Sequence, residues 1–161
     1  MKAMIFAAGL GTRLKPLTDD RPKAMVEIAG KPMLQHVIER VAAAGFDDIT
    51  INIHHFGQMI IDFLEKNDNF GLNIHISDER GLLLDTGGGI LKARQWLDGD
   101  DPFLVHNTDI ISTLTCEHSM IITAVTMLLR PFWSRRERLS AISSSMRMTA
   151  CVAGPIRLRV K

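Results

Sequence analysis

The sequence has few of the features that mark several large classes of protein. Its 161 residues include two cysteines, no tyrosine and a net charge of only +1. Two cysteines without metal-ligand spacing argue against a disulfide framework and are typical of a reducing, cytoplasmic compartment. Hydrophobic residues make up 46% and charged residues 23%, an ordinary globular composition that excludes a mainly disordered or fibrous chain. The small net charge argues against a globally basic nucleic-acid-binding protein.

Long hydrophobic runs are also missing. The longest apolar stretch near the end, residues 120–129, is far shorter than the roughly 20 residues that a transmembrane helix needs. The apolar residues 3–8 are too few for a secretory signal peptide, and a polar, glycine-broken segment follows them. We therefore expect a cytoplasmic protein that has no membrane partner.

Charge is distributed unevenly along the chain. Residues 1–111 hold 11 Lys and Arg against 16 Asp and Glu, a net charge of −5, whereas residues 112–161 hold 8 against 2, a net charge of +6. We interpret 112–161 as a divergent basic tail, explained by a reading frame that shifts after Ile111 or by partial disorder. A basic tail is typical of nucleic-acid or membrane-surface arms. This one has few interleaved aromatic residues, so we expect no nucleic-acid partner.

Apolar runs alternate with amphipathic segments throughout residues 1–111. Strands are predicted at residues 2–8, 48–53, 72–77 and 102–106, with a further short strand at 25–28. Helices are predicted at residues 32–44, at 58–66 and from 86 to 97. Strand–helix alternation of this kind predicts a three-layer α/β fold with a mostly parallel, Rossmann-like sheet. Ligands of such sheets bind beyond the carboxyl ends of the strands.

The loop after the first predicted strand has the chemistry of a phosphate site. Two glycines, Gly9 and Gly11, let backbone N–H groups approach an anion. Arg13 offers a fork for two phosphate oxygens, and Lys23 offers a compact charge. Leu14 stands where a dinucleotide-binding motif needs glycine or alanine, and the Gly-Lys-Ser/Thr of a P-loop is absent. The structural alternative is a plain turn with a solvated arginine.

Further motifs accompany this loop, and together they carry a resemblance to a known family. Pro22-Lys23 is followed by Gly30-Lys31-Pro32-Met33, then by Asp85-Thr86-Gly87-Gly88-Gly89, and Asp109 lies just after the fourth predicted strand. With these motifs, residues 1–111 resemble the N-terminal, nucleotide-binding part of a sugar-1-phosphate nucleotidyltransferase. Among members, they are similar to the short bacterial type that makes UDP-N-acetylmuramate or GDP-mannose. The expected fold is then a truncated nucleotidyltransferase fold.

The resemblance implies a reaction and a set of site residues. A sugar-1-phosphate oxygen attacks the α-phosphorus of a nucleoside triphosphate, UTP or GTP in the similar members, and pyrophosphate leaves. The implied catalytic residues are Arg13, on the departing pyrophosphate, and Lys23, on the α-phosphate. The implied ligand of the cofactor Mg²⁺ is Asp109, for which the alternative is a turn cap. The implied nucleotide-binding residues are Ala8, Gly9, Gly11, Thr12, Gly87 and Gly88.

The last part of the chain lacks what the family uses to bind its second substrate. After Ile111 only two acidic residues remain, Glu117 and Glu137, so a second metal-binding aspartate is missing. Glu79 and Leu84 lie where the family often contacts the base, but their alignment is loose and we leave Glu79 out of the site. Two functions stay open: nucleotidyl transfer to a sugar-1-phosphate, or non-catalytic nucleotide binding by a remnant without the sugar-binding half.

Overall fold

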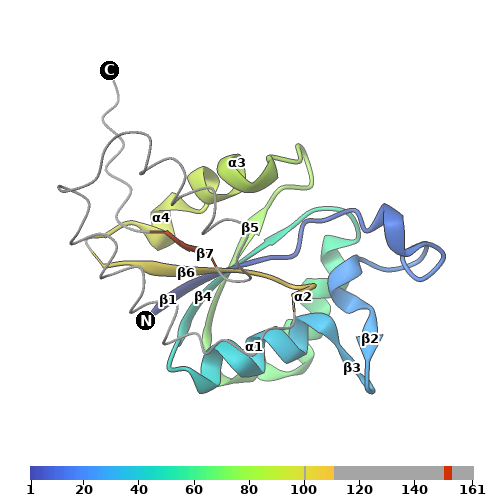
Figure 1. Cartoon of the computed structure of the whole chain (residues 1–161), viewed down its shortest axis with the longest axis horizontal. Helices are drawn as coiled ribbons and strands as arrows, with labels where there is room; N and C mark the ends of the chain where they lie inside the picture. Colours follow the sequence, from blue (N-terminus) through green and yellow to red (C-terminus); the bar gives the residue numbers. More distant parts are fainter. Residues whose placement is uncertain (100, 111–150, 154–161) are drawn as a thin grey trace.

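A mostly parallel sheet forms the centre of the molecule (Figure 1). The computed structural model describes residues 1–99, 101–110 and 151–153. The sheet has five strands in the order β5-β4-β1-β6-β7, where β1 is Lys2–Phe6, β4 is Asp48–Ile53, β5 is Asn73–Asp78, β6 is Phe103–Asn107 and β7 is Cys151–Ala153. The first four pair in parallel, and β7 runs antiparallel to β6. The predicted three-layer, mostly parallel α/β fold is confirmed.

Helices cover both faces of this sheet. On one face lie α1 (Met33–Ala43) and α2 (Gly57–Lys66), and on the other lie α3 (Asp85–Lys92) and α4 (Arg94–Leu97) (Figure 1). The larger core packs α1 and α2 against the sheet, with the alternate β4 residues Ile49, Ile51 and Ile53 fully buried in it. The smaller core lies under α3 and α4. Burial on both faces explains the nearly continuous apolar runs in β1 and β6, residues 3–6 and 103–105.

The structure departs from the predicted elements at three points. The predicted strand 2–8 ends at Phe6 as β1, because the N–H of Ala7 bonds to a side chain instead of to a neighbouring strand. The predicted helix 86–97 is divided at Ala93 into α3 and α4. The predicted strand 25–28 is part of a small antiparallel hairpin, β2 (Glu27–Ile28) with β3 (Lys31–Pro32).

The basic tail predicted at residues 112–161 lies outside the described residues, except for the backbone of β7. Within the described ranges, no helix combines the length and the apolar character that crossing a bilayer requires.

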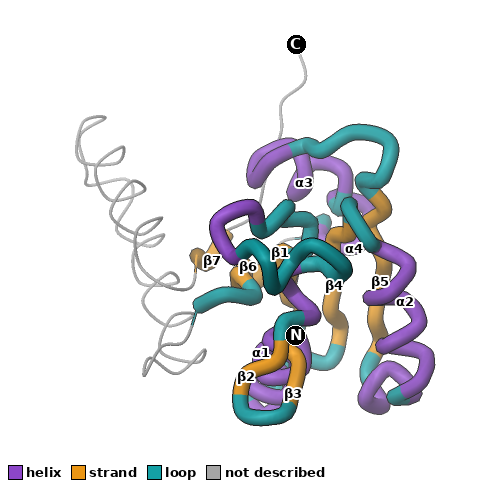
Figure 2. The backbone as a smooth tube through the Cα atoms, turned by 90° about the vertical axis from the view of Figure 1, so that its right-hand side faces the viewer, coloured by secondary structure: helices purple, strands orange, loops and turns teal. Residues whose placement is uncertain are grey.

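Parallel pairing places several loops on one edge of the sheet. The loop after β1, the turn after β6 and the loop between β5 and α3 all leave the carboxyl ends of neighbouring or near-neighbouring strands. In Figure 1 the carboxyl ends of β1 and β6 point to the right, and Figure 2 looks onto that side of the molecule. The edge is where a ligand is expected in this architecture.

Candidate functional site

The loop after β1 folds back over the segment that carries Lys23. Gly11 has left-handed backbone angles, φ 65° and ψ 20°, and its carbonyl accepts a 2.9 Å hydrogen bond from Thr18 Oγ1. A Cβ at this position would lie 2.8 Å from Thr18 Cγ2 and 3.0 Å from Lys23 Cβ. Glycine is therefore required at 11 for two reasons, backbone conformation and space. At Gly9 a Cβ would meet nothing within 4 Å.

The fold brings two of the predicted residues into direct contact. Lys23, on the short 3₁₀ turn η2 (Lys23–Met25), donates a hydrogen bond from Nζ to Oδ2 of Asp109. The side chain of Lys23 is 18% exposed and that of Asp109 is 40% exposed, so the pair is open to a ligand on one side. Residues 86 positions apart in the chain thus meet at the carboxyl edge.

The neighbouring strand ends fix where Asp109 lies. β1 and β6 are parallel partners, and Phe6 is in register with Asn107. One residue further on, Thr108 donates from Oγ1 to the carbonyl of Phe6 at 3.2 Å and from its N–H at 3.4 Å. Thr108 is buried, and Asp109 after it is exposed. The end of β6 is therefore tied to the start of the glycine-rich loop.

The remaining predicted residues of the first loop are arranged around this contact. Ala8 is buried, at 6% exposure, and Gly9 and Thr12 are exposed. Arg13 lies on the 3₁₀ turn η1 (Thr12–Leu14) and is exposed. In the part of the chain that the structure describes, no carboxylate lies within ion-pairing distance of its guanidinium. This charge is available for an anion.

The glycines of the Asp85–Gly89 motif lie inside α3, and they differ in their surroundings. Gly87 is exposed, with nothing within 4 Å of an added Cβ. A Cβ at Gly88 would lie 2.9 Å from Leu84 Cβ. Gly89 is buried, and its Cβ would lie 2.9 Å from Glu79 Oε1 and 3.2 Å from Phe6 Cε1. The close approach at Gly89 is thus to the protein itself, whereas the backbone at Gly87 is open to a ligand.

A buried polar pair beneath the site was missed by the sequence reasoning. Asn52 is 2% exposed and Glu79 is 0% exposed. Asn52 Oδ1 accepts the N–H of Ala7 at 2.8 Å, and Asn52 Nδ2 donates to Glu79 Oε1 at 2.9 Å. The signal available in the sequence was an asparagine between two isoleucines inside a predicted strand. A buried amide needs partners, and the partner is set only by the fold.

Burial and hydrogen bonding shift the pKa values of His106 and Asp78 at the ends of β6 and β5. Burial lowers the pKa of His106, which is 2% exposed on β6 three residues before Asp109. A hydrogen bond from the Arg80 guanidinium lowers the pKa of Asp78, at the end of β5. The described residues contain no group of three or more His, Cys, Asp or Glu side chains that could hold a metal by themselves. A metal at Asp109 would therefore need oxygen atoms of a bound molecule or of water to complete its coordination.

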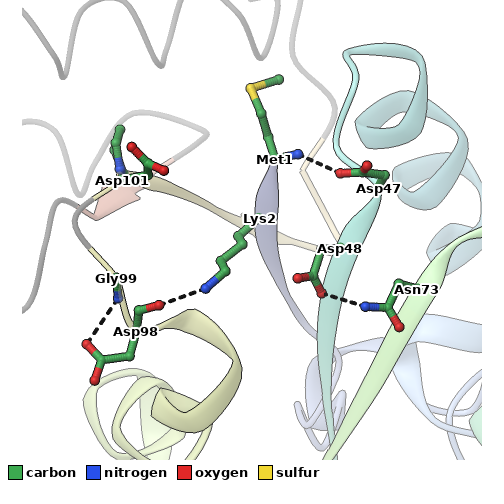
Figure 3. A pocket seen from close by; sticks show the side chains of 9 residues that line it. Met1, Lys2, Asp47, Asp48, Asn73, Asp98, Gly99 and Asp101 are labelled. Atoms are coloured by element: carbon green, nitrogen blue, oxygen red, sulfur yellow. Dashed lines mark hydrogen bonds and ion pairs between the residues drawn. The ribbon is translucent and has the colours of Figure 1, made fainter.

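A pocket among the described residues lies at another edge of the sheet (Figure 3). It has a volume of about 640 Å³ and lies where strands begin, as at Lys2 of β1, Asp48 of β4 and Asn73 of β5. Lys2 Nζ donates a 2.7 Å hydrogen bond to the carbonyl of Asp98 across it. None of the predicted site residues lines this pocket. Because parallel sheets bind ligands at the opposite edge, we do not place the site here.

The fold and the site define a class of protein: a three-layer α/β domain with a glycine-rich loop and paired Lys23 and Asp109 at the carboxyl edge of its sheet. Comparison with known proteins gives the family. The nucleotidyl transferase family profile matches residues 2–125. The chain belongs to this family.

Curated relatives and a solved structure agree with that assignment. The chain is 47% identical over 111 residues to the N-acetylmuramate alpha-1-phosphate uridylyltransferase of Caulobacter vibrioides, a match covering 68% of this chain and 46% of the relative. It is 44% identical over 113 residues to the mannose-1-phosphate guanyltransferase of Gibberella zeae, covering 69% and 31%. The crystal structure of HddC from Yersinia pseudotuberculosis complexed with GMP-PN matches at 32% identity and a TM-score of 0.64, covering 73% and 51%. The chain thus spans about half the length of these relatives or less.

Proposed function

We propose that this chain binds a nucleoside triphosphate at the carboxyl edge of its sheet. We also propose that the whole protein transfers a nucleotidyl group to a sugar-1-phosphate. The observation that carries the proposal is the contact between Lys23 and Asp109 beside the loop of Gly9, Gly11 and Arg13. It places a cation, a carboxylate and open backbone N–H groups at one edge, as triphosphate–metal binding needs.

Each predicted residue then has a role at a stated part of the nucleotide. The backbone of the first loop (Ala8, Gly9, Gly11 and Thr12) surrounds the phosphates, and that of Gly87 and Gly88 faces the base or ribose. Lys23 neutralises the charge that develops on the α-phosphate when the acceptor oxygen forms a bond to phosphorus. As that bond forms, the bond between the α-phosphorus and the bridging oxygen breaks, and Arg13 stabilises the pyrophosphate that takes up the electron pair.

Asp109 fits a magnesium ion that is shared with the nucleotide. Mg²⁺ keeps several waters and takes one or two carboxylates together with phosphate oxygens. A single, 40% exposed carboxylate is enough for such a site. When bound, the ion would neutralise phosphate charge. Asp109 would then exchange the Lys23 ammonium for the cation, which frees Lys23 to contact the α-phosphate.

The relatives suggest which substrates to test. UTP with N-acetylmuramate 1-phosphate and GTP with mannose 1-phosphate are the pairs indicated by the names of the two curated relatives. We also propose a cytoplasmic location, which the low cysteine content supports. The alternative function is nucleotide binding without turnover.

Thermal unfolding with each nucleotide tests binding. At 100 times its dissociation constant a ligand adds about 2.7 kcal/mol to the free energy of unfolding. We expect stabilisation by UTP or GTP that increases with Mg²⁺. Arg13→Ala and Lys23→Ala should each weaken binding by about tenfold to a hundredfold, the effect of losing one charged hydrogen bond. Asp109→Asn should remove the magnesium dependence and keep the fold.

A matched control removes a lysine at the other edge of the sheet. Lys66, at the end of α2, is exposed, and Lys66→Ala changes the net charge by the same amount as Lys23→Ala. Equal binding by all these variants would refute the site. Pyrophosphate release with the two sugar phosphates separates transfer from binding alone: release favours the enzyme, and its absence with tight nucleotide binding favours the alternative.

A further inference from the structure

Two loops of the site are joined beneath the surface by a continuous chain of hydrogen bonds. The chain begins at the N–H of Ala7, which donates to Asn52 Oδ1 at 2.8 Å. Asn52 Nδ2 donates to Glu79 Oε1 at 2.9 Å, and Glu79 Oε2 accepts the N–H of Leu84 at 3.2 Å. Ala7 opens the glycine-rich loop, and Leu84 directly precedes α3 and its three glycines. We call Asn52 and Glu79 the buried link.

The order of donors and acceptors in the buried link leaves little choice of side chain. Both ends of the chain are backbone N–H donors, so the two side chains must present an acceptor at each end and one donor between them. An asparagine followed by an ionised carboxylate meets this requirement. An asparagine followed by a glutamine does not, because every orientation leaves two donors facing each other at one junction or more. A charge this deeply buried is costly unless it is hydrogen-bonded.

The packing of α3 depends on the same pair. A Cβ at Gly89 would lie 2.9 Å from Glu79 Oε1 and 3.3 Å from Asn52 Nδ2. The helix backbone therefore rests on the buried link, and the absence of a side chain at Gly89 permits it. Figure 1 shows α3 above the sheet on this face.

A neighbouring side chain shows that burial alone does not produce such a chain. Ser77 of β5 is in register with Asn52 and is 1% exposed. Among the described residues, its Oγ is the one buried side-chain polar atom without a hydrogen-bond partner. The same layer of the sheet thus contains an unpaired hydroxyl beside a fully paired amide and carboxylate.

We propose that Asn52 and Glu79 are positioning residues that hold the glycine-rich loop and the loop before α3 at a fixed distance, so that triphosphate and nucleoside contacts are set together. Neither side chain needs to touch the phosphates for this, since both act through backbone N–H groups. The inference rests on the proposed function for its effect on nucleotide binding. The coupling of the two loops can be measured without a nucleotide.

Exchanging the two functional groups tests the buried link. In Asn52→Asp two carboxylates face each other, and in Glu79→Gln one donor–donor junction remains. The double variant Asn52→Asp/Glu79→Gln keeps the net charge and restores every bond, because Asp accepts from Ala7 and from the Gln amide, whose oxygen accepts from Leu84. Amide hydrogen exchange of the full chain, followed by NMR, reports protection at Ala7 and Leu84.

We expect each single variant to lower protection by about tenfold to a hundredfold at Ala7, at Leu84 or at both, as for loss of a hydrogen bond to a charged group. The double variant should return both to within about threefold of the wild type. Amides inside the sheet, such as that of Ile51, distinguish this local effect from global unfolding. Ser77→Ala is the matched control, since it removes a buried hydroxyl that bonds to nothing. Ser77→Ala should leave the protection of the Ala7 and Leu84 amides unchanged.

Affinity for UTP and GTP with Mg²⁺ completes the test. The single variants should bind the preferred nucleotide about tenfold more weakly, and the double variant should recover. Glu79→Gln that leaves both Ala7 and Leu84 protected, or a double variant no better than the single ones, overturns the link. Coupled exchange with unchanged affinity overturns its positioning role. If the wild type binds neither nucleotide, the proposed function fails, and the exchange comparison still decides whether the loops are coupled.

Discussion

Replacing Gly11 with alanine should destabilise the chain and displace Lys23. Gly11 has φ 65°, in the left-handed region, where an L-residue costs roughly 1–2 kcal/mol. The new methyl group would lie 2.8 Å from Thr18 Cγ2 and 3.0 Å from Lys23 Cβ, and overpacking of this kind costs about 1–3 kcal/mol. The lower entropy of alanine in the unfolded chain offsets about 0.4–1 kcal/mol. The net loss expected in the free energy of unfolding is therefore about 1–5 kcal/mol.

Thermal unfolding followed by circular dichroism measures this loss. At this size each kcal/mol shifts Tm by roughly 4 °C, so Gly11→Ala should unfold about 4–20 °C below the wild type. Gly9→Ala, in the same loop, is the control for stability. Gly9 has no neighbour within 4 Å of an added Cβ and is not among the residues with positive φ, so its Tm should stay within about 2 °C of the wild type. Equal Tm values for the two variants would refute the assigned loop geometry.

Two further predictions concern the packing of α3 on the sheet and the buried His106 of β6. Gly89→Ala and Gly87→Ala gain the same helix propensity, but only Gly89 lies against Glu79 and Phe6. In chemical denaturation Gly89→Ala should therefore be less stable than Gly87→Ala by about 1–3 kcal/mol. Equal stability of the two variants would contradict the packing of α3. Burial lowers the pKa of His106 in the folded state, so below pH ~6.5 the unfolded chain binds a proton that the folded chain resists. The free energy of unfolding should then fall as pH drops below about 6.5, by at most ~1.4 kcal/mol per pH unit from this group. His106→Gln should reduce that slope between pH 5 and 7, and an unchanged slope would show that His106 does not contribute.

Local sequence determined which segments form strands and helices, and which candidate site residues follow the ends of strands. Alternating apolar residues such as Ile49, Ile51 and Ile53 fit a buried strand whatever its neighbours, and the apolar spacing of residues 33–41 fits one face of a helix. Glycine at 11 was likewise visible, because a left-handed turn beside a strand end is a local property. The position of Asp109 directly after an apolar strand made it a candidate before any contact was known.

The tertiary structure decided which of these ends meet. Strand order puts β1 between β4 and β6, and no local pattern encodes that order. It brings Lys23 to Asp109 across 86 residues and Asn52 to Glu79 across 27. The division of the predicted last helix at Ala93 and the antiparallel β7 also depend on packing between distant segments. Hydrogen bonds between side chains need both partners in place at fixed distances, so a buried pair such as Asn52 and Glu79 becomes evident only when the whole sheet is formed.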